Sequence, residues 1–364
     1  MADTTTHVST PTELCESADF AIGFEDEATG THTIILDNDI DFNDEDYYYH
    51  KDNFMFFKTD VYGTKKTKII NMNNKTISNV FVYGGFSFIY SDMTYANQSN
   101  TKDSYRNVTF KDGTFEVVLN GGSFLNMLEI SGGYREAKYT EYTFKNCTFN
   151  IKTISFETMF YISGIIRYCN FINCTFNLDL INGQVSSKII NIPAPSAGLP
   201  SIFQLLSIES CQFKIRIHNS NIFSKKSSSP YAAIICLYNN TNNNYPINIS
   251  FNNNIVFIDN LTDSTNMEIL LIMTSQFPAS STHQNVSTLN NNFIAGLFSG
   301  NPITIQGLWV LSGFPLTTGS FFYDSEKVTI SSSSSYTKYA LTTAECKDAA
   351  ALAAAGYSLA NDAE

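Results

Sequence analysis

The sequence predicts an all-β fold in the form of a solenoid, and three observations support that prediction. A short motif recurs along the chain: an apolar residue, a polar break centred on Asn, Asp or Ser, a small residue and a second apolar residue. Asn tolerates the left-handed backbone of a tight turn, so each copy predicts strand, turn and strand. Hydrophobic residues make up 43% of the chain and charged residues only 15%, which favours strands over amphipathic helices. The clearest copies are residues 109–115, 143–149, 170–176 and 207–213, with looser copies at 250–254 and 288–293.

The spacing between copies indicates the kind of solenoid. Successive copies are 27 residues apart at the closest (Phe144 to Phe171) and 43 at the widest (Ile208 to Phe251). Short-period β-helices repeat strictly, whereas a large-coil right-handed parallel β-helix accommodates insertions in its outward loops. We therefore expect a right-handed parallel β-helix over residues 31–330.

With its repeated Phe-x-Asn-Cys-x-Phe segments, at residues 144–149 and 171–176, the chain resembles the pectin-lyase-like β-helix superfamily. The resemblance spans roughly residues 31–330 and implies the architecture of that superfamily. It leaves the activity open, because this fold carries lyases, hydrolases and inert spikes alike.

Residues 1–30 are expected to form an N-terminal arm with a short helix around residues 12–18. Such a helix would cover the apolar end of the first coil. Residues 33–42 predict the first clear strand region, in which alternate side chains point to opposite faces. The inward set is Ile34, Leu36, Ile40 and Phe42, and the outward set is Asp37, Asp39 and Asp41. A calcium loop is not expected here, because Phe42 stands where such a loop requires Gly.

Residues 331–364 are expected to form a serine linker followed by a C-terminal helix. The run Ser331 to Ser335 predicts the linker, and Thr342 with Glu345 forms a capping box ahead of an alanine-rich stretch. Gly356 predicts the helix end. This ending is similar to the tails of bacteriophage structural proteins.

Three groups of residues recur at equivalent places and predict structural rows inside the solenoid. Coil-equivalent residues stack in a line and do not converge as metal ligands do, and free Cys behaves as a small hydrophobe. We therefore expect a stack of buried thiols and not a metal site, beside a ladder of turn amides and rows of aromatic rings. The members are Cys147, Cys174 and Cys211; Asn146, Asn173, Asn253 and Asn291; and Phe110, Phe144 and Phe171.

Aromatic residues near the N-terminal end predict an assembly surface. Large apolar patches usually mark protein contacts, and this reading is favoured over a sugar-stacking platform. The C-terminal helix is the second candidate attachment point, since an alanine-rich helix of this length needs a packing partner. The candidate assembly contacts are Tyr47, Tyr48, Tyr49, Phe56, Phe57 and Leu352.

Catalysis is the main alternative, because many phage β-helix proteins resemble tailspike depolymerases. Glycan cleavage requires two carboxylates a few ångströms apart. Between Tyr142 and Phe257 the carboxylates are Glu157, Asp179 and Glu209, which fall in different copies and at different repeat positions. The family's hydrolase motifs are absent, so no catalytic, cofactor-binding or metal-binding residue is predicted. A polysaccharide depolymerase or a host-glycan-binding spike remains the alternative function.

Net charge and targeting signals limit the classes of partner that we expect. The net charge of −12 argues against nucleic acid, and no apolar run is long enough for a membrane helix. The start of the chain predicts no signal peptide, and seven scattered Cys suit folding in a reducing cytosol. Together with the phage-like tail, these features predict a non-enzymatic virion protein that folds in the host cytoplasm.

Within the particle, we expect a capsid decoration or head-fibre component, because only about thirty residues precede the first predicted strand. The expected partners are other virion proteins and further copies of this chain. Phage proteins of this kind are commonly trimers, so a homotrimer is the arrangement that the resemblance implies. A host surface glycan is the remaining candidate partner.

Overall fold

The computed structural model describes residues 3–19, 22–25, 29–43, 53–58, 65–92, 105–128, 139–162, 166–183, 187–192, 205–219, 233–238, 248–263, 267–275, 287–296, 300–305, 308–310, 319–330 and 336–354. Within these ranges the chain is mostly β, with two helices.

The helices are α1 (Pro11–Ala18) and α3 (Thr343–Ala354). The strands are β1 (Thr4–Val8), β2 (Thr29–Leu36), β3 (Ile40–Asp41), β4 (Asn53–Lys58), β5 (Lys65–Asn71), β6 (Thr76–Tyr83), β7 (Ser87–Asp92), β8 (Tyr105–Asn120), β9 (Ser123–Leu128), β10 (Tyr139–Ser155), β11 (Thr158–Ile162), β12 (Ile166–Ile172), β13 (Thr175–Leu180), β14 (Lys188–Ile192), β15 (Leu205–Glu209), β16 (Gln212–Ile217), β17 (Ala233–Tyr238), β18 (Asn248–Asn252), β19 (Ile255–Asn260), β20 (Met267–Ser275), β21 (Ser287–Gly296), β22 (Ile303–Ile305), β23 (Leu308–Val310), β24 (Gly319–Asp324), β25 (Val328–Ile330) and β26 (Tyr336–Leu341).

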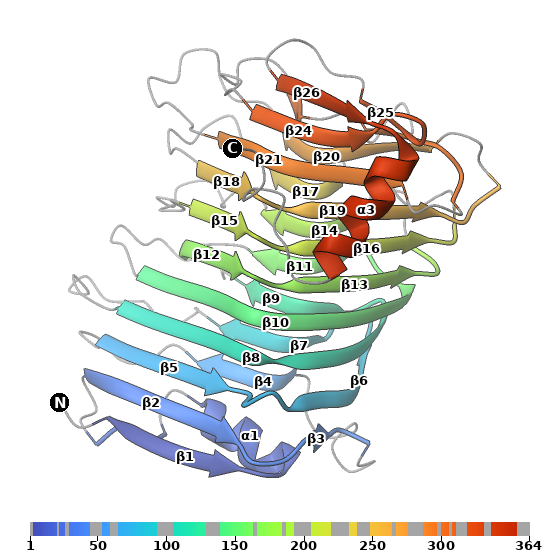
Figure 1. Cartoon of the computed structure of the whole chain (residues 1–364). Helices are drawn as coiled ribbons and strands as arrows, with labels where there is room; N and C mark the ends of the chain where they lie inside the picture. The colour runs from blue at the N-terminus through green and yellow to red at the C-terminus, as the bar shows by residue number, and fades with distance from the viewer. Residues whose placement is uncertain are drawn as a thin grey trace.

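These strands form two long parallel sheets, one of 16 strands and one of 10. The chain alternates between the sheets, and each circuit through both of them forms one coil. The coils follow one another in sequence order from β1 at one end to β26 at the other (Figure 1). In the larger sheet, the long strands β8 and β10 pair in register along almost their whole length. The predicted all-β class is confirmed, and the arrangement is compatible with a parallel solenoid.

The core lies between the two sheets and is built from rows of aromatic rings. The rings of Phe110 and Phe144 stack with centroids 5.2 Å apart and planes 9° apart, and Phe171 continues the row at 5.1 Å and 8°. A second row runs beside it, in which Phe149 and Phe176 stack at 4.8 Å. All five rings are fully buried. The predicted inward rows are therefore confirmed.

Strand parity at the N-terminal end is also as predicted. The side chains of Ile34, Leu36, Ile40 and Phe42 are fully buried, whereas those of Asp37, Asp39 and Asp41 are exposed. The predicted helix is present as α1, which begins with a capping box between Thr10 and Glu13. It contacts β1, β2 and β4 and buries Leu14 and Ala18 in the core.

A fully buried lysine fastens α1 to the first coils. The Lys68 ammonium donates hydrogen bonds to the carbonyls of Ser17 and Asp19 at the C-terminal end of the helix. A cation suits this position, because the last carbonyls of a helix carry partial negative charge. Desolvation by burial, together with the Lys68 charge, lowers the pKa of neighbouring His32 to about 4. His32 is therefore neutral in the folded protein at physiological pH.

The structure extends the strands at both ends beyond the predicted limits. β1 lies in the stretch expected to be an arm and pairs in register with β2, from Thr4 opposite His32 to Val8 opposite Leu36. β26 lies in the stretch expected to be linker and pairs with β24. Neither strand carries the turn motif, so the repeat pattern could not reveal them. The serine run itself, residues 331–335, lies outside the described residues.

The stacked rings make a specific stability prediction. Replacing Phe171 with Ala removes a fully buried ring that stacks on Phe144 and packs edge-on against Phe176, so we expect a loss of about 3–5 kcal/mol in unfolding free energy. Ile172 is the next residue along the strand and is 36% exposed, so Ile172→Ala is the matched control. Denaturant unfolding followed by circular dichroism measures both. Equal losses in the two variants would contradict the assigned parity.

Candidate functional site

The turn in the larger sheet is the most regular feature of the described residues. In five successive coils one residue at this turn adopts a left-handed backbone conformation, with φ between 54° and 59°. Asn and Asp tolerate this conformation better than other residues with a side chain. The residues are Asp112, Asn146, Asn173, Ser210 and Asn253. The bend that each of them makes separates the two halves of the strand, as between β12 and β13.

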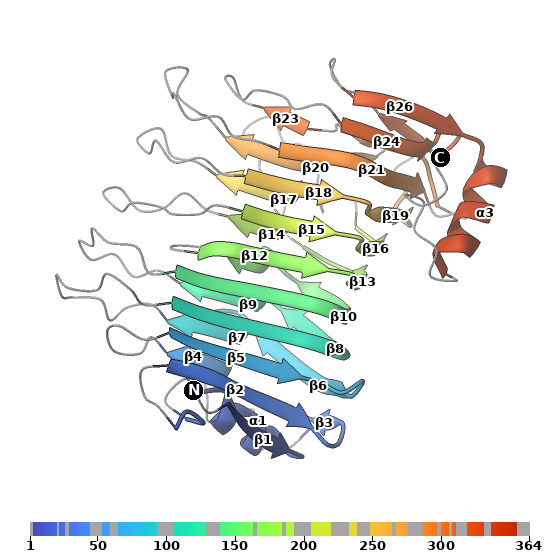
Figure 2. The same cartoon turned by 60° about the vertical axis from the view of Figure 1, so that its left-hand side comes forward.

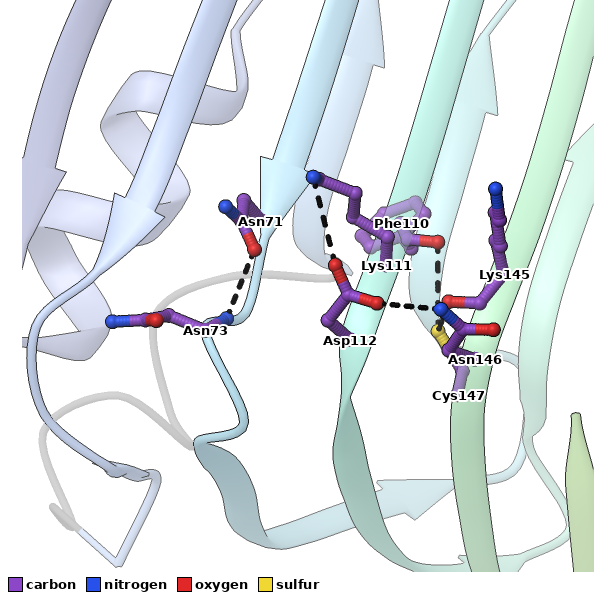
Figure 3. Close-up of polar contacts among 8 residues, drawn as sticks. All are labelled: Asn71, Asn73, Phe110, Lys111, Asp112, Lys145, Asn146 and Cys147. Carbon is purple, nitrogen blue, oxygen red and sulfur yellow. Dashed lines mark hydrogen bonds and ion pairs between the residues drawn. The ribbon is translucent and has the colours of Figure 1, made fainter. Parts of the chain in front are cut away.

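Side chains of the turn residues join one coil to the next. The Asn146 amide donates to the Asp112 carboxylate at 2.8 Å, and the Asn173 amide donates to Asn146 Oδ1 at 2.9 Å. Figure 3 shows the first of these contacts, together with the Lys111 ammonium 3.5 Å from the Asp112 carboxylate. Ser210 has no amide group, so the chain of amides ends at Asn173. The predicted ladder is thus present for Asn146 and Asn173, while Asn253 shares their backbone conformation.

The residue after the left-handed position points inward and supplies a donor to the preceding coil. Cys147 Sγ lies 3.5 Å from the carbonyl oxygen of Phe110, as Figure 3 shows. Cys174 makes the same contact with Phe144 at 3.3 Å, and Cys211 makes it with Phe171 at 3.4 Å. Each thiol also lies close to the carbonyl two residues earlier in its own strand. These three side chains are buried in one row, as predicted.

Asparagine replaces cysteine in this row in the later coils. Asn254 Nδ2 donates to the carbonyl of Ile208 at 2.8 Å, and Asn292 Nδ2 donates to the carbonyl of Phe251 at 2.8 Å. Both side chains are fully buried, and the backbone N–H of Asn254 donates to Asn292 Oδ1. The sequence motif had drawn attention to the neighbouring residues Asn253 and Asn291. Asn291 lies in β21, and its side chain is outside the described set.

Cys147 and Cys211 act as neutral donors in the thiol row. Hydrogen bonding with Cys174, together with burial, raises the pKa of the Cys147 thiol, and burial raises the pKa of the Cys211 thiol well above its ordinary value. A protonated thiol can donate to a carbonyl, whereas a zinc ligand must be a thiolate. Within the described ranges, the structure contains no group of three or more His, Cys, Asp or Glu side chains placed to hold a metal ion.

Carboxylates on the outer face of the larger sheet also join coils. Glu209 accepts hydrogen bonds from the hydroxyl groups of Ser207 and Ser250 and from the amide of Asn252. Asp179 lies 2.7 Å from the His218 ring in the next coil. These two carboxylates, which fall in different copies of the motif, have partners in neighbouring coils. Glu157 is exposed and lies in the turn before β11.

The C-terminal helix covers an apolar part of that same outer face. Cys346 on α3 is fully buried and packs with Phe257 of β19 and Phe293 of β21. The partly buried residues Phe322 and Leu341 border this cluster. Figure 2 shows α3 beside the larger sheet, outside the stack of strands and close to β24 and β26. The helix therefore has a packing partner within its own chain.

The outward-facing rows of the larger sheet change from polar to apolar residues where α3 packs. Gln212 of β16 stands opposite Ile255 of β19, which stands opposite Phe293 of β21. In the neighbouring row, exposed Lys214 stands opposite buried Phe257. Sequence analysis missed this surface, although residues 255–258 carry its signal: an apolar run without alternation indicates a strand buried on both faces.

Most of the predicted assembly contacts are beyond what the structure describes. Tyr47, Tyr48 and Tyr49 lie outside the described residues. Phe56 and Phe57 lie on β4, opposite Tyr90 and Ser91 of β7, and Leu352 lies on α3. The structure describes the side chains of none of these three residues, so their role as contacts stays a prediction.

Comparison with protein-family models, with curated proteins and with solved structures finds no match for this chain. In the described part of the chain, neither helix has the length and hydrophobicity needed to cross a membrane.

The turn row predicts a graded response to mutation at Asn173. Asn173→Ala places a residue that disfavours the left-handed conformation at φ 54° and removes the amide contact with Asn146, so we expect a loss of about 1–2 kcal/mol in unfolding free energy. Asn173→Gly also removes the contact, but Gly adopts the left-handed conformation readily. The loss of unfolding free energy should therefore be smaller than for Asn173→Ala. Asn177→Ala is the control, since it removes an equivalent amide contact with Asn150 away from the turn. Urea unfolding would contradict the assignment if Ala and Gly at position 173 were equivalent.

Proposed function

We propose that this chain is a right-handed parallel β-helix of the pectin-lyase-like type and a non-enzymatic structural protein of a bacteriophage particle. Within the particle it serves as a capsid decoration or head-fibre component. It folds in the host cytoplasm and then joins the virion. Its partners are other virion proteins and further copies of itself, with a trimer as the proposed assembly.

The observation that carries this proposal is how the polar groups of the coils are used. The carboxylates of Glu209 and Asp179, the amides of Asn146 and Asn173 and the thiols of the inner row all contact neighbouring strands. Polar side chains that link one coil to the next stiffen the stack along its axis. A stiff and regular body suits a particle component better than an enzyme, which needs polar groups directed at a substrate.

The alternative function, a depolymerase, would require a different arrangement of carboxylates on the outer face of the larger sheet. Glycan cleavage requires an acid and a second carboxylate flanking one glycosidic bond. Glu209 accepts hydrogen bonds from Ser207, Ser250 and Asn252 at Oε1, so this oxygen atom is used within the sheet. Asp179 is similarly placed against His218. These contacts favour a structural use of both groups.

Two measurements test the proposed function. Peptide mass spectrometry of purified particles, followed by cryo-electron microscopy, should find the protein at regular positions on the capsid. Incubation of the purified protein with host capsular and wall polysaccharides should release no reducing ends. Release of reducing ends by the protein, or its absence from purified particles, would overturn the proposal.

A truncation tests the role of the C-terminal helix in assembly. Deleting residues 342–364 leaves β26 in place, so we expect the sheets to remain folded, as judged by circular dichroism. It also uncovers Phe257 and Phe293, which α3 covers. We therefore expect weaker incorporation into particles.

Point variants separate the packing of the helix from its presence. Cys346→Asp places a charge in the buried cluster, whereas Ala344→Asp places one on an exposed position two residues earlier. Only the first should reproduce the truncation. If the truncated chain is incorporated as well as the full chain, the helix only covers its own sheet, and the attachment site lies elsewhere.

A further inference from the structure

The chain contains two Asn-Gly pairs, and the structure holds them in different ways. They are Asn120-Gly121, at the end of β8, and Asn182-Gly183, which follows β13. In such a pair the glycine nitrogen can attack the amide carbon of the preceding side chain, because glycine has no side chain to shield its own nitrogen. Whether a given pair reacts therefore depends on where the folded chain directs the glycine N–H.

The Gly183 nitrogen lies against the side chain of Asn182. Its N–H donates to Asn182 Oδ1 at 3.1 Å, which closes a short ring between the backbone nitrogen and the side-chain amide of the residue before it. The amide carbon Cγ carries that oxygen, so a small rotation of the side chain brings the nitrogen and the carbon into contact. Asn182 is exposed, so water and hydroxide reach the pair.

The next coil supplies a second donor to the same oxygen. Leu180 stands opposite Ile217 where β13 pairs with β16. Asn182 and Asn219 each lie two residues further on, so they occupy equivalent places in successive coils. Asn219 Nδ2 donates to Asn182 Oδ1 at 3.0 Å. Attack on Cγ moves negative charge onto Oδ1, and a donor that is already in place stabilises that charge.

Contacts with the preceding coil fix the backbone of Asn182. Its N–H donates to the Thr153 carbonyl at 3.4 Å, and the Thr153 hydroxyl donates back to the Asn182 carbonyl at 3.2 Å. Thr153 is fully buried, which limits competition from water for these contacts. Residue 182 is thus held by Thr153 on one side and by Asn219 on the other, so the reacting geometry is a property of the folded stack.

The other Asn-Gly pair is held away from reaction. Asn120 stands opposite Tyr83 of β6 and Ser155 of β10, so strands flank it on both sides. The Gly121 N–H donates to the Ser155 carbonyl at 2.7 Å. An attack on the Asn120 side chain would first have to break this hydrogen bond, which costs free energy. The same dipeptide is therefore protected at one place in the fold and poised to react at the other.

We propose that Asn182 is a self-modifying residue, which the Gly183 nitrogen converts to a carboxylate with the assistance of Asn219. Hydroxide takes the Gly183 N–H proton, and the nitrogen forms a bond to Asn182 Cγ. The Cγ–Nδ2 bond then breaks, and the departing nitrogen takes a proton from water and leaves as ammonia. A further water molecule opens the cyclic imide at either of its carbonyls and leaves aspartate or isoaspartate at position 182. The reaction consumes water and needs no oxidant or reductant.

The conversion changes the joint between coils. Either product replaces a neutral amide with a carboxylate, which still accepts the hydrogen bond from Asn219 but adds negative charge to a chain of net charge −12. Isoaspartate also routes the main chain through the side-chain carbon, which adds one backbone atom beside the Thr153 contacts. Accumulating isoaspartate should therefore loosen this edge of the stack as the folded protein ages. The modification goes beyond the proposed role in a particle and does not depend on it.

Peptide mass spectrometry on the full-length protein tests the site directly. The protein is incubated in mildly alkaline buffer made with heavy-oxygen water, either folded or in guanidinium chloride, and the label marks the residues that react. In the folded protein we expect Asn182 to react at least about tenfold faster than Asn120. In guanidinium chloride both pairs lose their contacts, so the two rates should become similar. Similar rates in the folded protein would overturn the proposal, because the structure would then not select between the pairs.

Variants at the site test the roles of the glycine and of Asn219. Gly183→Ala shields the attacking nitrogen and should slow the modification of Asn182 about tenfold. Asn219→Ala removes the donor to Oδ1 and should slow it about threefold to tenfold, since this donor is only half-buried.

Asn177→Ala is the control, because it removes an amide contact elsewhere on β13 and should leave the rate unchanged. Matching circular dichroism spectra and thermal unfolding show that each variant is folded. The proposal is overturned if Asn182 stays unmodified in the folded parent, or if either Gly183→Ala or Asn219→Ala reacts as fast as the parent.

Discussion

A single requirement organises this molecule: each coil must bend at the same place without losing its register on the coil before it. The bend places one residue in the left-handed conformation and leaves a carbonyl of the preceding coil facing inward. A side chain then supplies the donor, from a thiol in Cys147, Cys174 and Cys211 and from an amide in Asn254 and Asn292. The acceptor is the equivalent carbonyl in each of these five coils, so thiol and amide are two solutions to one hydrogen-bonding problem.

Fixed register at the bend determines what the rest of each strand can do. Because the bend is aligned, Phe144 falls directly between Phe110 and Phe171, and the rings stack with nearly parallel planes. Outward positions are aligned in the same way, so a change of residue type along one row changes the surface locally. The row from Gln212 through Ile255 to Phe293 turns from polar to apolar, and α3 packs at the point where it does so.

The sequence was informative wherever a feature repeats along a strand or from one coil to the next. Parity from Ile34 to Phe42, the ring rows and the thiol row follow from local periodicity and from the turn motif, and the structure agrees with them. Features without a repeat were missed. β1 and β26 lack the motif, and Asn254 was hidden because a thiol and an amide look unrelated in sequence although they donate to equivalent carbonyls. Strand pairing also brings together Asn126, Tyr161 and Asn191, which no local pattern connects.

The rows of the two sheets also differ in the chemistry of their members. A row that serves stacking is constrained at every coil, since each member must fit the one below, and the inner row of thiols and amides keeps one hydrogen-bonding role. The row of Asn126, Tyr161 and Asn191 instead alternates amide and phenol, and it leaves Asn126 Oδ1 unpaired among the described residues. Stacking alone gives no reason for that arrangement, because an apolar residue would pack there without a desolvation cost. Its mixed chemistry therefore sets this row apart from the rows that support the stack.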